Sequence, residues 1–126
     1  MKMRIKGNSL RLRISQTEMK QLLREGRIDE TIRFAPEADA RLTYALEHGV
    51  SDREIGLRYH AQEVAIVLST AAVKRWAEGD DVGIYGEAET GDGTVTLLVE
   101  KDFACLDGDD PQDADAFPNP KAGVVC

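Results

Sequence analysis

Hydrophobic and polar residues alternate along much of this chain, and the alternation predicts most of its strands. Leu10, Leu12 and Ile14 alternate with Arg11 and Arg13, which is typical of a strand with one apolar face. Similar patterns predict seven more strands, at residues 3–6, 28–34, 42–46, 55–60, 64–68, 82–89 and 94–102. The chain is therefore expected to be rich in β-structure.

Two segments follow the helical period instead. Ser15 and Glu18 form a capping box at the start of a helix over residues 16–25, and Gly26 is placed to end it. Its apolar residues share one face, at the spacing i, i+3 and i+4: Met19, Leu22 and Leu23. A second helix is expected over residues 71–78, with Trp76 as its largest apolar residue.

The two helices and the strands before them match at a constant spacing of 54 positions. The matched pairs are Leu12 with Ile66, Ile14 with Leu68, Ser15 with Ser69, Met19 with Val73 and Leu22 with Trp76. This spacing predicts a duplicated β-α-β-β(-β) unit within one domain at residues 1–102, with halves at about 3–60 and 62–102. Residues 103–126 are rich in aspartate and proline, and we expect them to form an irregular acidic tail.

The fold class that follows is α+β. Most connections are too short for a crossover between parallel strands, so we expect a mainly antiparallel sheet of about eight strands with two helices packed on it. A sheet of this size can curl, and an open or closed barrel is the alternative to a flat sheet.

Charge is distributed unevenly and narrows the range of partners. The net charge is −7, but residues 1–60 hold 12 Lys and Arg against 9 Asp and Glu, whereas residues 61–126 hold 4 against 14. The acidic half would repel nucleic acid. No apolar run approaches the roughly 20 residues of a membrane helix, and no apolar segment of a signal peptide follows the first residues. Two cysteines, Cys105 and Cys126, are too few for a disulfide framework. We therefore expect a cytoplasmic protein without nucleic-acid or membrane partners.

Basic side chains gather on the polar positions of the strands in the first half. The candidate anion-binding residues are Arg4, Lys6, Arg11, Arg13, Arg33 and Arg58. If the expected sheet is concave, these side chains would line one channel. Arginine suits this role because its planar fork of donors binds phosphate or carboxylate groups with two hydrogen bonds. The alternative is a solvated sheet face without a ligand.

Carboxylates occupy the polar positions of the second half. Glu87, Glu100 and Asp102 could hold Mg²⁺ or Mn²⁺ bridging a bound phosphate. The duplicated topology, with charged residues opposite the helices, resembles the CYTH-like triphosphate tunnel fold. That resemblance implies metal-dependent hydrolysis of a triphosphate. The strand at residues 3–6 carries Arg4 and Lys6 in place of the glutamates of that fold's Glu-x-Glu-x-Lys signature.

A second resemblance rests on local sequence. The opening MRIKGNSLRLR (residues 3–13), the segment VEKDFACL (residues 99–106) and the run FPNP (residues 117–120) resemble an uncharacterised family of small bacterial proteins. This resemblance spans nearly the whole chain and implies no particular activity.

Three interpretations remain open. The preferred one is a non-enzymatic protein of unknown function that binds a small phosphate-containing anion or a protein partner. The first alternative is a divergent metal-dependent phosphohydrolase, which alone would need Mg²⁺ or Mn²⁺. The second is a structural or self-associating protein, in which an exposed sheet edge pairs with a second copy to form a homodimer.

Overall fold

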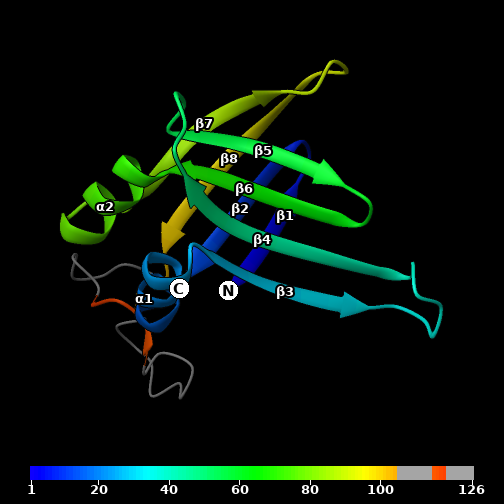
Figure 1. Ribbon diagram of the computed structural model, residues 1–126, viewed down its shortest axis with the longest axis horizontal. Coiled ribbons are helices and arrows are strands. Elements are labelled where there is room, and N and C mark those ends of the chain that lie inside the picture. Colours follow the sequence, from blue (N-terminus) through cyan, green and yellow to red (C-terminus); the bar gives the residue numbers. More distant parts are fainter. Residues whose placement is uncertain (105–114, 119–126) are drawn as a thin grey trace.

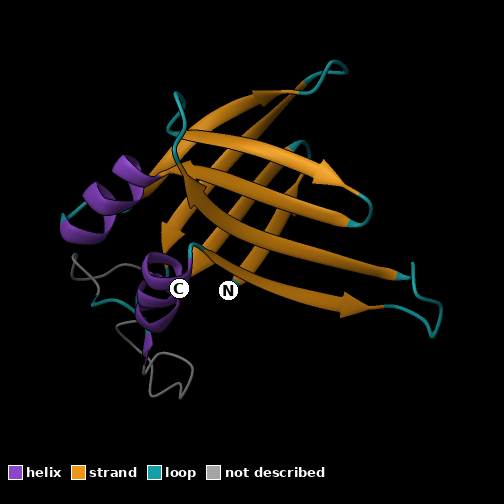
Figure 2. Ribbon diagram, viewed as in Figure 1, coloured by secondary structure: helices purple, strands orange, loops and turns teal. Residues whose placement is uncertain are grey.

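The computed structural model describes residues 1–104 and 115–118, and these form two β-sheets with two helices at one end (Figures 1 and 2). The elements in chain order are β1 (Lys2–Lys6), β2 (Ser9–Ile14), α1 (Gln16–Glu25), β3 (Arg27–Arg33), β4 (Arg41–Gly49), β5 (Ile55–His60), β6 (Glu63–Ser69), α2 (Thr70–Glu78), β7 (Gly83–Glu89) and β8 (Thr94–Lys101). The predicted α+β class and the order of elements are confirmed.

The strands are divided between two sheets of four. Sheet A has the order β1-β2-β8-β7 and sheet B the order β3-β4-β6-β5, so the expected sheet of about eight strands is replaced by two layers and does not close into a barrel. Four of the strand pairs are antiparallel, as predicted, but the central pairs β2–β8 and β4–β6 are parallel. Connection lengths did not reveal these pairs, because each joins strands from different parts of the chain.

The internal repeat runs β-β-α-β-β twice, with the second unit beginning at β5. The boundary between the halves thus lies in residues 50–54, earlier than the predicted boundary near residue 61, because β5 pairs with β6 as β1 pairs with β2. Each sheet contains one hairpin from each half. Sheet A is therefore related to sheet B by the repeat, and positions in paired strands of one sheet have counterparts in the other.

Both helices begin and end where local chemistry predicts. The Ser15 hydroxyl accepts a hydrogen bond from the Glu18 amide, the Glu18 carboxylate accepts one from the Ser15 amide, and Gly26 ends α1 with φ 81°. Ser69 caps α2 by accepting a hydrogen bond from the Ala72 amide. Each helix carries the chain from one sheet to the other, so it covers the end of the sandwich and not one face of a sheet (Figure 1).

The core lies between the inner faces of the two sheets and the apolar stripes of the helices. Its largest fully buried side chains are Trp76, Leu12, Ile14, Leu22, Leu46, Ile66, Leu68, Leu97, Val73 and Val99. The indole of Trp76 donates a hydrogen bond to the carbonyl of Val82, which satisfies its one polar atom. The alternating apolar residues thus face the opposite sheet, and the alternating charged residues lie on two outer faces.

Part of the C-terminal region returns to the body. Phe117 forms a bridge with Phe103, and their rings meet edge to face with centroids 6.4 Å apart. Asp115 accepts hydrogen bonds from the amide and hydroxyl of Thr17 at the start of α1. The interpretations of Cys105, Cys126 and most of the acidic tract concern positions outside the described residues. Neither described helix is long and apolar enough to cross a membrane.

Candidate functional site

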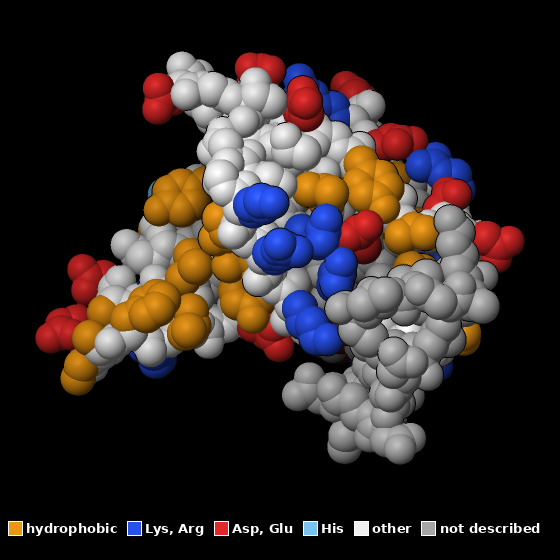
Figure 3. Space-filling view, turned by 180° about the vertical axis from the view of Figure 1, so that it is seen from behind, with side chains coloured by type: hydrophobic (Ala, Val, Ile, Leu, Met, Phe, Trp, Pro, Cys, Tyr) orange, Lys and Arg blue, Asp and Glu red, His pale blue; other side chains and the backbone are white. Residues whose placement is uncertain are grey.

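The outer face of sheet A carries a group of basic side chains, here called the cationic face and defined by Arg4, Lys6, Arg11 and Arg13. Arg4 lies opposite Arg11 in the hairpin of β1 and β2, and Lys6 lies opposite Ser9. All four cations occupy alternate positions, so they point away from the core on the same side. Figure 3 shows Lys and Arg side chains gathered at the centre of this side of the molecule.

A pocket lies within the cationic face. It is lined by Arg4, Lys6, Ser9 and Arg11, and its volume is about 160 Å³. Pockets for drug-sized ligands usually measure about 300–1,000 Å³. The space suits a group of a few heavy atoms, such as a phosphate, and the basic lining favours an anion.

One carboxylate, that of Glu100, lies among these cations. Its Oε1 is 3.1 Å from Nε of Arg11 and 3.8 Å from Nε of Arg13. The Arg11 Nε and Glu100 Oε1 are both buried, yet they are not aligned as a hydrogen bond. The contact between Arg11 and Glu100 is therefore an ion pair without an aligned hydrogen bond, and the Arg11 guanidinium could turn toward a ligand without breaking one.

Tyr85 fixes the other side of this carboxylate. Its hydroxyl donates a hydrogen bond of 2.9 Å to Glu100 Oε2. Burial, and then the hydrogen bond to Glu100, raise the pKa of Tyr85 to about 12, so the phenol remains a neutral donor at neutral pH. Glu100 thus presents only Oε1 to the arginines.

On the outer face of sheet B, in contrast, the arginines are paired with carboxylates. Arg27 and Arg58 are paired with Glu47 and Glu63 in a group here called the ion network. Arg27 donates to Glu47 and, at 2.6 Å, to Glu63. Arg58 donates to Glu47 at 2.6 Å and to Glu63 at 2.9 Å. Each cation of the network is therefore shared by the same two carboxylates.

The ion network lies across two small residues of the central strands, Ala45 and Ala65. Both are fully buried although they point to the outer face. The hydrogen bonds to Glu47 raise the pKa of Arg58 most, and those to Arg27 lower the pKa of Glu63 most. Arg58 and Glu63 are thus held in their charged forms.

The structure separates the six predicted anion-binding residues. The four that form the cationic face lie on sheet A. Arg33 lies on the outer face of sheet B opposite Arg41, and Arg58 belongs to the ion network. The expected single channel is wrong, because the polar positions belong to two sheets whose outer faces point in opposite directions.

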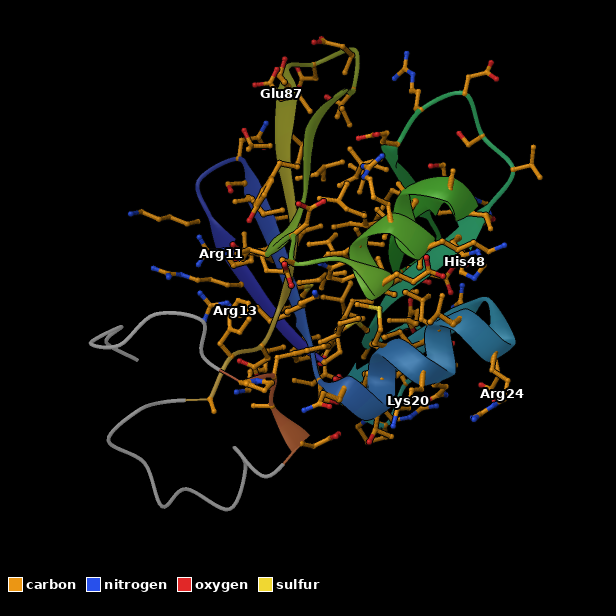
Figure 4. All side chains as sticks on the ribbon, turned by 90° about the vertical axis from the view of Figure 1, so that its left-hand side faces the viewer. Arg11, Arg13, Lys20, Arg24, His48 and Glu87 are labelled. Atoms are coloured by element: carbon orange, nitrogen blue, oxygen red, sulfur yellow. The ribbon has the colours of Figure 1, made fainter. Side chains whose placement is uncertain are left out.

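The three predicted metal ligands are not brought together. Among the described residues there is no group of three or more His, Cys, Asp or Glu that could hold a metal ion. Glu100 is paired with arginine, and Asp102 with Lys2 at 2.9 Å. Figure 4 shows Arg11 and Arg13 on the same side of β2, while Glu87 lies toward the far end of β7.

Several residues of these two faces were not predicted: Ser9, Arg27, Glu47 and Glu63. All of them occupy polar positions of alternating strands, which is the signal that identified the other candidates. Their roles depend on which strands pair, because Glu47 and Glu63 meet only through the parallel pair β4–β6. The sequence alone gave no indication of that pair.

The chain was compared with protein families, curated proteins and solved structures. A family model described as a family of unknown function (DUF7009) matches residues 1–121. No curated protein and no solved structure matches the chain. The resemblance to an uncharacterised family is thereby confirmed, whereas the resemblance to the CYTH-like triphosphate tunnel fold is not supported.

Proposed function

Since the chain belongs to this family of unknown function, we propose a function from its own site: the cationic face of sheet A binds a small phosphate-containing anion. The observation that carries the proposal is the surplus of cations. Of the four basic side chains of this face, Arg11 and Arg13 share the carboxylate of Glu100. Arg4 and Lys6 form no ion pair with any of the described residues. An anion entering the pocket would balance this charge.

The internal repeat supports the position of the ligand. Ser9 in β2 is the counterpart of Glu63 in β6, 54 positions later, and Arg4 is the counterpart of Arg58. In sheet B the carboxylate of Glu63 accepts a hydrogen bond from Arg58. In sheet A the serine is too short to fill this place, and the pocket lies there. The proposed ligand occupies the position that Glu63 occupies in the other sheet.

The lining residues have distinct roles in this proposal. Arg11 offers its terminal guanidinium nitrogens to two oxygens of the ligand, while Glu100 holds its Nε from the other side. Arg4 and Lys6 supply positive charge from β1, and Ser9 supplies a hydroxyl donor. Phosphate is favoured over a single carboxylate because three or four oxygens can engage several donors at once.

The test is calorimetric titration of tripolyphosphate, with and without Mg²⁺, into the unaltered chain and into Arg11→Ala/Arg13→Ala. A hydrogen bond from a charged group contributes about 1.5–3 kcal/mol to binding, so the affinity of the double variant should fall by about 100-fold or more. Arg33→Ala/Arg53→Ala removes the same charge from exposed positions elsewhere and should bind as the unaltered chain does.

Equal losses in both double variants would contradict the proposal, because affinity would then follow overall charge and not the site. Binding without release of phosphate would agree with a non-enzymatic role. Release of phosphate that depends on Mg²⁺ would instead favour the phosphohydrolase alternative.

A further inference from the structure

The sandwich has two corners, where an edge strand of sheet A lies beside an edge strand of sheet B: β7 beside β5, and β1 beside β3. The repeat relates these corners, but they differ in packing. At one corner β7 packs against β5, so closely that a Cβ added at Gly86 would lie 2.4 Å from Cγ2 of Ile55. At the other corner the counterparts are Glu30 in β3 and Met1, whose amino group lies 3.5 Å from the Glu30 carboxylate. Beyond this contact β1 and β3 diverge (Figure 1). The second corner is therefore open.

Large apolar side chains are exposed at the open corner. Ile5 is 64% exposed, Ile32 48% and Phe34 68%. Ala88, the counterpart of Ile32 at the closed corner, is only 8% exposed. In Figure 3 a continuous hydrophobic surface extends from the edge of the cationic face over this part of sheet B. Exposed apolar surfaces of this kind commonly bind other macromolecules.

The open corner is bounded by a free strand edge. β1 is the outermost strand of sheet A, and it turns into β2 through the two residues Gly7 and Asn8. In such a hairpin the residues beside the turn are hydrogen-bonded to each other, and the pattern then alternates. The N–H and C=O groups of Met3 and Ile5 therefore point away from β2, toward the open corner.

The side chains of β1 define what could pair with this edge. Arg4 and Lys6 project on the outer side, and no ion pair involves either of them within residues 1–104 and 115–118. Ile5 projects on the inner side. A second copy of β1 placed antiparallel to the first would bring cations opposite cations, which is unfavourable. The edge thus suits a strand with acidic side chains on one face and apolar side chains on the other.

We propose that the open corner binds an extended segment of another protein in which acidic and apolar residues alternate, and that this segment adds to β1 as a fifth strand of sheet A. Its backbone bonds to Met3 and Ile5. Its acidic side chains face Arg4 and Lys6, and its apolar side chains cover Ile32 and Phe34. Strand addition of this type is a common mode of peptide recognition, in which backbone bonds give affinity and alternate side chains give specificity.

The experiment uses a synthetic peptide of about seven residues in which Glu and Val alternate, a usual strand length. Hydrogen exchange of the backbone amides is followed by NMR on the full chain. The amides of Met3 and Ile5 should exchange about tenfold more slowly, or slower still, when the peptide is present. A peptide in which Lys and Val alternate should give no protection.

A charge-reversed variant, Arg4→Glu/Lys6→Glu, provides the matched control. It should exchange the preference, so that the Lys and Val peptide protects Met3 and Ile5 and the Glu and Val peptide does not. Peptide binding that leaves these amides unprotected would overturn the proposal, as would the absence of binding or a preference that the variant does not change. Binding of tripolyphosphate is measured separately. If the chain does not bind tripolyphosphate but the peptide protects Met3 and Ile5, the anion site is refuted and the strand-addition site is retained.

Discussion

The outer faces of sheets A and B occupy equivalent positions in the repeat, yet they handle charge in opposite ways. Glu47 and Glu100 are counterparts, as are Arg58 and Arg4. In sheet B, Arg58 lies opposite Ala65, and the small side chain leaves room for the guanidinium to reach two carboxylates. In sheet A, Arg4 lies opposite Arg11, so this space is already occupied by a like charge.

Equivalent strand positions of the two halves thus serve different purposes, one in stability and one in the proposed ligand binding. An arginine surrounded by carboxylates stabilises the fold and has few donors to spare, whereas its counterpart beside other cations is available to a ligand. The side chains on the neighbouring strand decide between these outcomes, since the strand positions themselves are the same. Three changes would break or sharpen this contrast.

The largest effect is expected from Ser9→Glu, which gives sheet A the carboxylate that sheet B has at Glu63. The new carboxylate would pair with Arg4 and fill the pocket, so affinity for tripolyphosphate should fall by about 100-fold or more, as for the loss of two charged hydrogen bonds. Calorimetry measures the loss. Ser9→Gln has nearly the same size without the charge and should keep much of the affinity. Equal weakening by both would mean that bulk, and not charge, blocks the pocket.

An intermediate effect is expected when the two equivalent arginines are removed in turn. Arg58→Ala leaves Glu47 and Glu63 with one cation and should lower the free energy of unfolding by about 1 kcal/mol, given that the pair is partly exposed. Arg4→Ala removes a cation from opposite Arg11 and should change that free energy by less than about 0.5 kcal/mol, in the stabilising direction. Urea denaturation at low salt distinguishes them, and equal destabilisation would show that the faces do not differ.

The smallest effect is expected in how the free energy of unfolding depends on acidic pH. Hydrogen bonds from Arg27, and then from Arg58, lower the pKa of Glu63 below its ordinary value of 4.5. The unfolded chain therefore binds more protons near that pH than the folded chain does, so the contribution of Glu63 is complete above pH 4.5 and is lost as pH falls through the folded pKa.

Urea midpoints measured across this range test the effect. Glu63→Gln should lower stability at neutral pH but make the decline below pH 4.5 shallower. Glu87→Gln removes an exposed carboxylate from sheet A and serves as the control, with a decline like that of the unaltered chain. An unchanged slope in Glu63→Gln would place the acid sensitivity elsewhere.

Local patterns were sufficient to predict the elements of this fold. The alternation around Leu12 and the capping box of Ser15 and Glu18 act through neighbours in the chain, and both were found as expected. Strand partners depend on residues far apart in sequence, such as Leu12 beside Val99, and no local pattern encodes them. The expected single sheet failed for this reason.

The same limit applies to the candidate site. Alternation correctly placed Arg11 and Arg13 on a polar face, because side-chain direction follows from the strand period. It could not separate Arg58 from Arg4, since that distinction depends on Glu47 and Glu63 reaching β5 through the pairing of β4, β6 and β5.

The exchange of hairpins between the sheets also bears on the origin of the molecule. Each half contributes one hairpin to each layer, and the halves are joined along the parallel pairs β2–β8 and β4–β6 and through residues 50–54, where Val50 is fully exposed. In this respect the chain has the design of an interlocked dimer whose two subunits have been fused. A peptide of half the length could build the same architecture by pairing with its own copy, and a single cut in residues 50–54 would leave two fragments held together by the strands they share.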